Sequence, residues 1–166
     1  MLSPEYKKLL EETHHDLAWG NSSINHVDNI FDFIKNNNIT DMLDYGAGKQ
    51  LLAKGLQTRC PDVNIHCYDP GIPDISDKPN PASMVCCTDV LEHVEPEFID
   101  AVLDDLKRVV LNIGYFIVSV KPAQKILPDG RNAHLIVQPI EWWRDQLSKR
   151  FIIKEQHDNF FIVCPK

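Results

Sequence analysis

A glycine-containing turn, Asp44-Tyr45-Gly46-Ala47-Gly48, ends the apolar run that begins at Asp41. Glycine lets the backbone approach a bound ligand where a Cβ atom would collide with it. A second acid, Asp69, follows another apolar run over residues 63–68. Doubly wound α/β domains hold a nucleoside-containing cofactor with this pair of features, because the distal acid accepts hydrogen bonds from the ribose hydroxyls. These residues therefore predict a cofactor of that kind.

A second group of polar residues, Asp89, Glu92 and His93, follows the third apolar run. The pKa of a histidine lies near neutrality, so His93 is a candidate general base, with Glu92 and the distant His134 as further candidate catalytic residues. The structural alternative is that Glu92 and His93 cap the segment that follows them. The side chains of Asp89, Glu92, His93 and His134 also supply oxygen and nitrogen ligands suited to Mg²⁺ or Mn²⁺. These interpretations remain open at the level of the sequence.

Alternating strands and helices are predicted to position these groups. Apolar spacing predicts helices over residues 4–16, 23–36, 49–59 and 96–110 and after Pro139, and strands over 41–45, 63–68, 83–88, 115–120, 151–157 and 160–164. Such alternation indicates a Rossmann-like three-layer α/β fold with a mostly parallel sheet. Only Asp158 and Asn159 separate the last two strands, so these must form an antiparallel hairpin. Ligands bind at the carboxyl ends of such strands.

The composition restricts the classes of function. The chain has 166 residues with 17 Lys plus Arg against 24 Asp plus Glu, and the net charge of −7 argues against a broad nucleic-acid-binding surface. No run approaches the roughly 18 apolar residues of a membrane span, and the first residues lack a signal-peptide pattern. Five cysteines without paired CxxC spacing predict reduced thiols and a cytoplasmic location.

In combination, these motifs resemble the class I S-adenosylmethionine-dependent methyltransferases. Leu43 to Gly48 is similar to their first motif, Tyr68-Asp69 to their second and Thr88 to His93 to their fourth. The resemblance covers about residues 41–120, and the terminal hairpin agrees with it. It implies S-adenosyl-L-methionine as the cofactor, with contacts from Asp44, Gly46, Ala47, Gly48, Asp69, Pro70, Asp89, Val90 and Trp19. A nicotinamide-dependent oxidoreductase is disfavoured, because Leu51 stands where a dinucleotide fingerprint has its third glycine.

The chain departs from the family after Asp69, where a further helix and strand are usual. The segment Gly71 to Ala82 has room for neither, so it is expected to wrap the adenine directly and to leave one edge of the sheet shortened. That edge is a candidate surface for a second copy of the chain or for a partner subunit. The expected organisation is one domain, with residues 1–40 as an N-terminal helical cap on an α/β core of residues 41–166.

The phrase Asp89-x-x-Glu92-His93 with a later His134 is similar to the metal sites of two methyltransferase groups. One group methylates the 2′-oxygen at the 3′ ends of small RNAs, and the other is the catechol-type O-methyltransferases of ubiquinone synthesis. In both groups the first acid is usually glutamate. The expected function is O- or N-methylation of a small molecule. A divalent-metal-dependent RNA 2′-O-methyltransferase and a non-catalytic S-adenosylmethionine-binding subunit of a larger complex are the alternatives.

Overall fold

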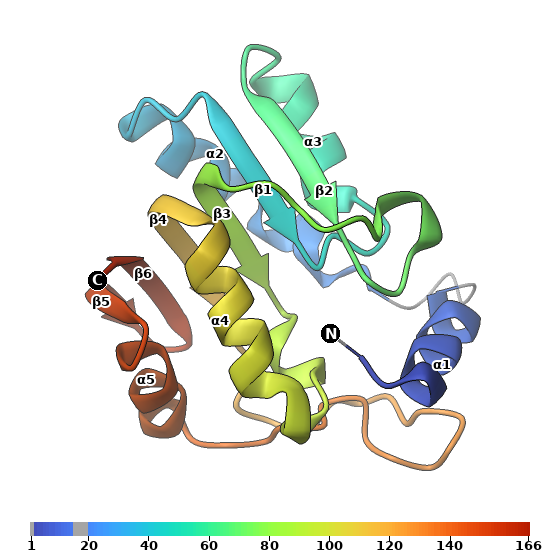
Figure 1. Ribbon diagram of the computed structural model, residues 1–166. Coiled ribbons are helices and arrows are strands. Elements are labelled where there is room, and N and C mark those ends of the chain that lie inside the picture. Colours follow the sequence, from blue (N-terminus) through green and yellow to red (C-terminus); the bar gives the residue numbers. More distant parts are fainter. Residues whose placement is uncertain (1, 15–19) are drawn as a thin grey trace.

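The computed structural model describes residues 2–14 and 20–166. A sheet in the order β2-β1-β3-β4-β6-β5 forms its centre (Figure 1). Strands β1 to β4 pair in parallel, and β6 lies antiparallel to both β4 and β5. The predicted Rossmann-like sheet with a terminal hairpin is confirmed. Its strands are β1 (Asp41–Tyr45), β2 (Asn64–Tyr68), β3 (Ala82–Thr88), β4 (Val110–Ile117), β5 (Phe151–His157) and β6 (Phe160–Pro165).

Helices cover both faces of the sheet, and period-two alternation along the strands decides which side chains they meet. Met42 and Met84 pack with α2 and α3, whereas Leu43 and Val85 pack with α4 and α5 on the opposite face. The helices are α1 (Pro4–His14), α2 (Val27–Asn36), α3 (Leu51–Arg59), α4 (Ile99–Val109) and α5 (Ile140–Ser148). Short 3₁₀ turns occupy η1 (Ser22–His26), η2 (Pro73–Ile75), η3 (Leu91–His93) and η4 (Pro96–Phe98).

Helix α1 belongs to neither layer. Its Tyr6 is buried in a separate small cluster with Leu127 and Ala133, at the carboxyl ends of the parallel strands. Helix α2, by contrast, is part of the layer that packs on the sheet. The residues of the expected cap thus lie in two places: α1 and η1 lie at the strand ends, and α2 packs on the sheet. Residues 15 and 16 of the predicted first helix lie outside the described residues.

The predicted strand over residues 115–120 is wrong at both ends. Strand β4 begins at Val110, directly after α4, and Val110 pairs with Ala82 across a register shift. Asn112 and Gly114 interrupt the apolar pattern at the start of β4, so the sequence does not reveal this part of the strand. Gly114 lies in the same stretch because a Cβ there would approach Val163 Cγ2 to 2.6 Å.

The shortened edge is confirmed. Strand β2 ends the sheet, and the connection from β2 to β3 contains only the turn η2. The long segment between β4 and α5 has no regular strand or helix, and its single bridge joins Ile126 to Asn132. Among the described residues, no helix is both long enough and apolar enough to cross a membrane.

Candidate functional site

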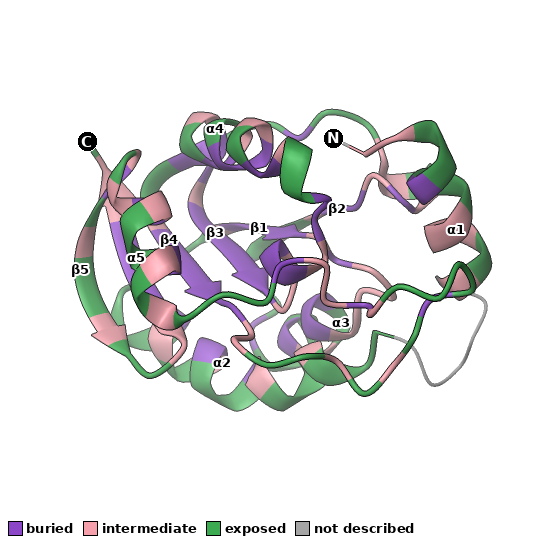
Figure 2. Cartoon of the chain, turned by 90° about the horizontal axis from the view of Figure 1, so that it is seen from below, coloured by how far each residue is buried: buried purple, intermediate pink, exposed green. Residues whose placement is uncertain are grey.

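A cavity of about 520 Å³ lies where the parallel strands end, within the size range of small-molecule sites. Figure 2 views the molecule from this side, with buried residues concentrated in the sheet and α1 standing apart from it. The cavity wall is built from the glycine turn after β1, the end of β2, the end of β3, helix α1, residues 20–23 at the start of η1, and the long segment after β4. The sequence predicted that the first three of these would meet, and they do.

The glycine turn is held against the end of β2 by its own backbone. The N–H groups of Gly46 and Ala47 donate to the carbonyl of Tyr68 over 2.7 and 3.0 Å. Gly46 has a φ of 81°, and a Cβ at this position would lie 2.5 Å from Cγ2 of Val90. Both the left-handed backbone and the contact with Val90 therefore require glycine here.

Asp69 joins the two predicted cofactor motifs. Its Oδ2 accepts a hydrogen bond from the Gly48 N–H at 2.9 Å, and its Oδ1 accepts one from the Gly71 N–H at 2.8 Å. The side chain is largely buried yet lines the cavity. Carboxylate oxygens each accept more than one hydrogen bond, so Asp69 retains acceptor capacity toward a ligand.

Asp44 lies beneath the turn and does not reach the cavity wall, in contrast to the contact expected from the sequence. Its side chain is 3% exposed, and it is absent from the residues that line the cavity within the described chain. Burial, with the charge of Asp69, raises the pKa of Asp44 to about 7, although a backbone hydrogen bond from Ala53 opposes the shift. Asp44 therefore supports the turn from inside the fold.

Asp89 closes β3 in a left-handed conformation, with a φ of 54°, and lines the cavity together with Val90. Its Oδ2 lies 3.0 Å from Nε2 of His26, which η1 supplies. Burial raises the pKa of Asp89, but hydrogen bonds from His26 and Ser22 outweigh that effect and the pKa falls below its ordinary value. An ionised carboxylate is thus held at the end of β3.

Glu92, His93 and His134 converge beside the cavity, and each offers a ligand atom within 4.8 Å of the other two. Nδ1 of His93 donates to the carbonyl of Ala133 at 2.8 Å, and Nδ1 of His134 donates to that of Lys121 at 2.6 Å. A neutral imidazole that donates from Nδ1 carries its lone pair on Nε2. Both histidines line the cavity, whereas Glu92 is fully buried behind them.

The carboxylate of Glu92 is only half satisfied. Its Oε1 accepts the Ser119 N–H at 2.8 Å, but its buried Oε2 has no hydrogen-bond partner in the described part of the chain. Burial is the main reason that the pKa of Glu92 rises to about 8. An unsatisfied buried oxygen next to two imidazoles is the donor set of a two-histidine, one-carboxylate cation site.

The three ligand atoms lie within 4.8 Å of one another, so small side-chain movements would bring them to the ligand distances of one divalent ion. Asp89 was also a predicted metal ligand, but it does not belong to this cluster of described residues. Asp89 instead turns toward His26 at the end of β3.

Comparison with known proteins bears on the fold. No protein-family model matches the sequence, and no curated protein matches it. Among solved structures, a 1,6-didemethyltoxoflavin-N1-methyltransferase of Burkholderia thailandensis superimposes with a TM-score of 0.66 at 12% identity, over 97% of this chain and 88% of that one. The mitomycin 7-O-methyltransferase MmcR gives 0.68 at 11% identity, over 99% and 58%. The chain has the class I methyltransferase fold.

Some of the solved structures with this fold are longer than this chain. An O-methyltransferase family protein of B. thailandensis gives a TM-score of 0.57 at 10% identity, over 88% of this chain and 57% of that one. The chain thus spans less than two thirds of the length of this protein and of MmcR. Identities this low establish a common methyltransferase fold and nothing finer.

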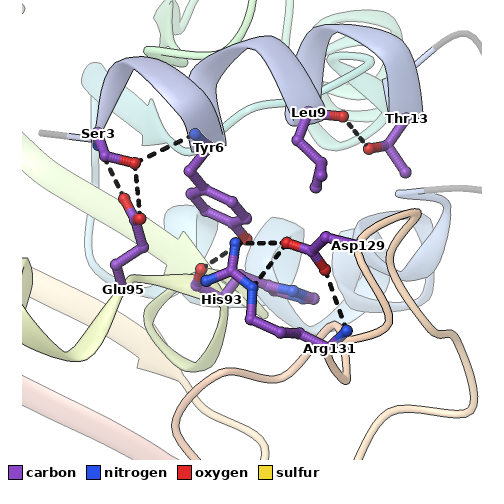
Figure 3. A network of polar contacts seen from close by, with 8 residues as sticks. All are labelled: Ser3, Tyr6, Leu9, Thr13, His93, Glu95, Asp129 and Arg131. Atoms are coloured by element: carbon purple, nitrogen blue, oxygen red, sulfur yellow. Dashed lines mark hydrogen bonds and ion pairs between the residues drawn. The ribbon is translucent and has the colours of Figure 1, made fainter.

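The sequence predicted an N-terminal cap but not the contacts that hold α1 in place. The Tyr6 hydroxyl donates to the carbonyl of His93 at 2.8 Å, and the backbone N–H and Oγ of Ser3 donate to Glu95 at 2.8 and 2.7 Å (Figure 3). The guanidinium of Arg131 lies 5.4 Å from the centre of the Tyr6 ring. None of these residues belongs to a motif. Trp19, a predicted cofactor contact, lies outside the described residues.

Proposed function

We propose that this chain is an S-adenosylmethionine-dependent methyltransferase that acts on an oxygen or nitrogen of a small molecule. The observation that carries the proposal is the hydrogen bond from Gly48 to Asp69, which unites the glycine turn and the distal acid on one cavity wall. The toxoflavin enzyme with the same fold contains bound S-adenosylhomocysteine, which supports the choice of cofactor.

Each wall of the cavity has a task in this proposal. Asp69 accepts hydrogen bonds from the ribose hydroxyls, and Gly46, Ala47 and Gly48 pass close to the amino-acid part of the donor. Pro70 borders the nucleoside, while Asp89 and Val90 lie toward the sulfur. When bound, the cofactor supplies an electrophilic methyl group, whose bond to sulfur breaks as the bond to the acceptor forms.

The acceptor needs alignment and, where it is a hydroxyl, removal of its proton. His93 is the candidate base, because its ring lines the cavity and its Nδ1–H is fixed by Ala133, which leaves Nε2 as the basic atom. His134 contacts it edge-on, with ring centres 4.8 Å apart, and lines the same wall. Glu92 acts from behind the histidines rather than on the acceptor itself.

A second candidate function is a divalent-metal-dependent RNA 2′-O-methyltransferase. The convergence of Glu92, His93 and His134 favours it, since these residues would hold Mg²⁺ or Mn²⁺. A cation there supplies positive charge that lowers the pKa of an acceptor hydroxyl. The net charge of −7 argues against an RNA substrate. A non-catalytic donor-binding subunit is the remaining alternative.

Binding of S-adenosylhomocysteine tests the cofactor. Calorimetry should show binding of S-adenosylhomocysteine and none of NAD⁺. Asp69→Asn should weaken binding at least about tenfold, because hydrogen bonds to a charged group contribute about 1.5–3 kcal/mol. Asp62→Asn, at an exposed acid of the same region, is the matched control and should bind normally. Binding of NAD⁺ alone would overturn the proposal.

Transfer of a labelled methyl group tests catalysis and separates the alternatives. The chain should label small molecules in a metabolite extract and leave a pool of small RNAs unlabelled. Labelling of RNA that EDTA abolishes would favour the metal-dependent RNA enzyme instead. A chain that binds the donor but labels neither pool would be a binding subunit.

A further inference from the structure

The N-terminal segment supplies three cavity-lining side chains that no cofactor motif contains: Tyr6 and Leu10 on helix α1, and Leu2 just before it. These line the same cavity as Asp69 and Pro70, the two residues at the end of β2. The helix lies beside the carboxyl ends of the strands, outside both helical layers (Figures 1 and 2). The described chain therefore places an apolar helix face against a nucleoside site.

Leu10 lies beside Gly71, as does Asp69, the acid proposed to bind the ribose. A Cβ on Gly71 would lie 3.3 Å from Cβ of Leu10 and 3.2 Å from Oδ1 of Asp69. Leu10 and Asp69 thus both lie next to Gly71. The absence of a side chain on Gly71 leaves room for both. The base of a nucleoside is bonded directly to its ribose, so a base attached to a ribose at Asp69 lies within reach of Leu10.

The segment after β2 does not provide this surface. The sequence led us to expect that Gly71 to Ala82 would wrap the adenine, but none of its residues lines the cavity. This segment follows the edge strand and forms only the short turn η2. An adenine has two apolar faces that need to be covered by protein, and Pro70 alone is too small to cover both.

We propose that Leu10, supported by Leu2 and Tyr6, forms the wall on which the adenine of the methyl donor packs. Helix α1 thereby replaces the helix and strand that this chain lacks after β2. The inference rests on the proposed function, because it assumes a donor whose ribose binds Asp69. Helix α1 is fixed in this place by the hydrogen bond from the Tyr6 hydroxyl to the carbonyl of His93 and by the hydrogen bonds from Ser3 to the carboxylate of Glu95 (Figure 3).

Leu9 provides a matched control for Leu10. Both leucines are half-buried on α1 and pack against the cluster of Tyr6, Leu127 and Ala133. Of these two leucines only Leu10 lines the cavity, so Leu9→Ala removes packing of the same helix without touching the donor. Calorimetry with S-adenosylhomocysteine should show binding about tenfold weaker for Leu10→Ala, from lost apolar contact. Leu9→Ala should bind within about twofold of the unaltered protein.

A direct contact measurement makes the test independent of folding effects. In unaltered protein labelled at the leucine methyl groups, the adenine protons of bound S-adenosylhomocysteine should show nuclear Overhauser effects to the Leu10 methyls. The Leu10 signals are assigned by their loss in Leu10→Ala. Absence of these effects, or equal loss of affinity in Leu9→Ala and Leu10→Ala, would overturn the inference and leave the methyltransferase proposal intact. Failure of the unaltered protein to bind S-adenosylhomocysteine would overturn both.

Discussion

Replacement of Gly46 by alanine probes the turn on which the cofactor site depends. Gly46 has a φ of 81°, in the left-handed region that side chains with a Cβ rarely adopt. The added methyl would also meet Cγ2 and Cγ1 of Val90 at 2.5 and 2.6 Å. We therefore expect Gly46→Ala to destabilise the fold and to displace the end of β3 from the turn.

The expected magnitude combines two separate costs. A left-handed residue with a Cβ costs about 1–2 kcal/mol, and forcing a methyl group into packed surroundings costs about 1–3 kcal/mol. Together they predict a loss of about 2–5 kcal/mol in the free energy of unfolding. For a chain of this length that loss corresponds to a decrease in Tm of about 10 °C. Because Gly46 and Ala47 donate to Tyr68, next to Asp69, affinity for S-adenosylhomocysteine should fall as well.

Two further variants separate the costs by urea denaturation. Gly130 has a φ of 87° and no atom within 4 Å of an added Cβ, so Gly130→Ala measures the backbone cost alone. Val90→Ala removes the two methyls that collide, so the double variant Gly46→Ala/Val90→Ala should recover about 1–3 kcal/mol relative to the sum of the single changes. If Gly46→Ala cost no more than Gly130→Ala, or if the double variant showed no recovery, the packing argument would be refuted.

The remaining predictions concern two buried carboxylates. Burial raises the pKa of Asp44 to about 7 in the folded state, whereas an aspartate in the unfolded chain ionises near pH 4. The unaltered protein should therefore lose stability relative to Asp44→Asn as the pH rises from about 4 to about 7, by up to about 4 kcal/mol in urea titrations; a constant difference would contradict the assigned pKa. Addition of Mn²⁺ should raise the Tm of the unaltered protein and of the exposed-site control Glu97→Gln, but not of Glu92→Gln. Equal stabilisation of all three would exclude a cation at Glu92.

The arrangement of the sheet could be predicted because local rules agree with it. The strands at residues 41–45 and 151–157 match the structure, since apolar runs there end at strong turn signals. The two-residue connection at Asp158 and Asn159 leaves only a hairpin as its geometry. The early start of β4 escaped prediction, because Asn112 and Gly114 interrupt the apolar pattern of a strand that inter-strand pairing stabilises.

The site was predictable where motifs follow strand ends and unpredictable where distant segments complete it. Gly48 meets Asp69 because the carboxyl ends of adjacent parallel strands share one edge of the sheet. His26 and Asp89 are in contact although 63 residues separate them in the sequence, and no local pattern marks such a contact. The side-chain direction of Asp44 was equally hidden, since one residue of register along β1 decides between the cavity and the interior.

Several places where this chain departs from ordinary backbone and polar chemistry lie at the carboxyl ends of the parallel strands. Gly46, Gly48 and Asp89 have positive φ and line the cavity. The buried carboxylates of Asp44 and Glu92 each keep one oxygen without a hydrogen-bond partner in the described chain, and both lie just behind the cavity wall. Left-handed backbone and unsatisfied buried acids each cost free energy. These costs lie at the strand ends, where a bound ligand or cation would offset part of them, and this supports placing the proposed site at that edge.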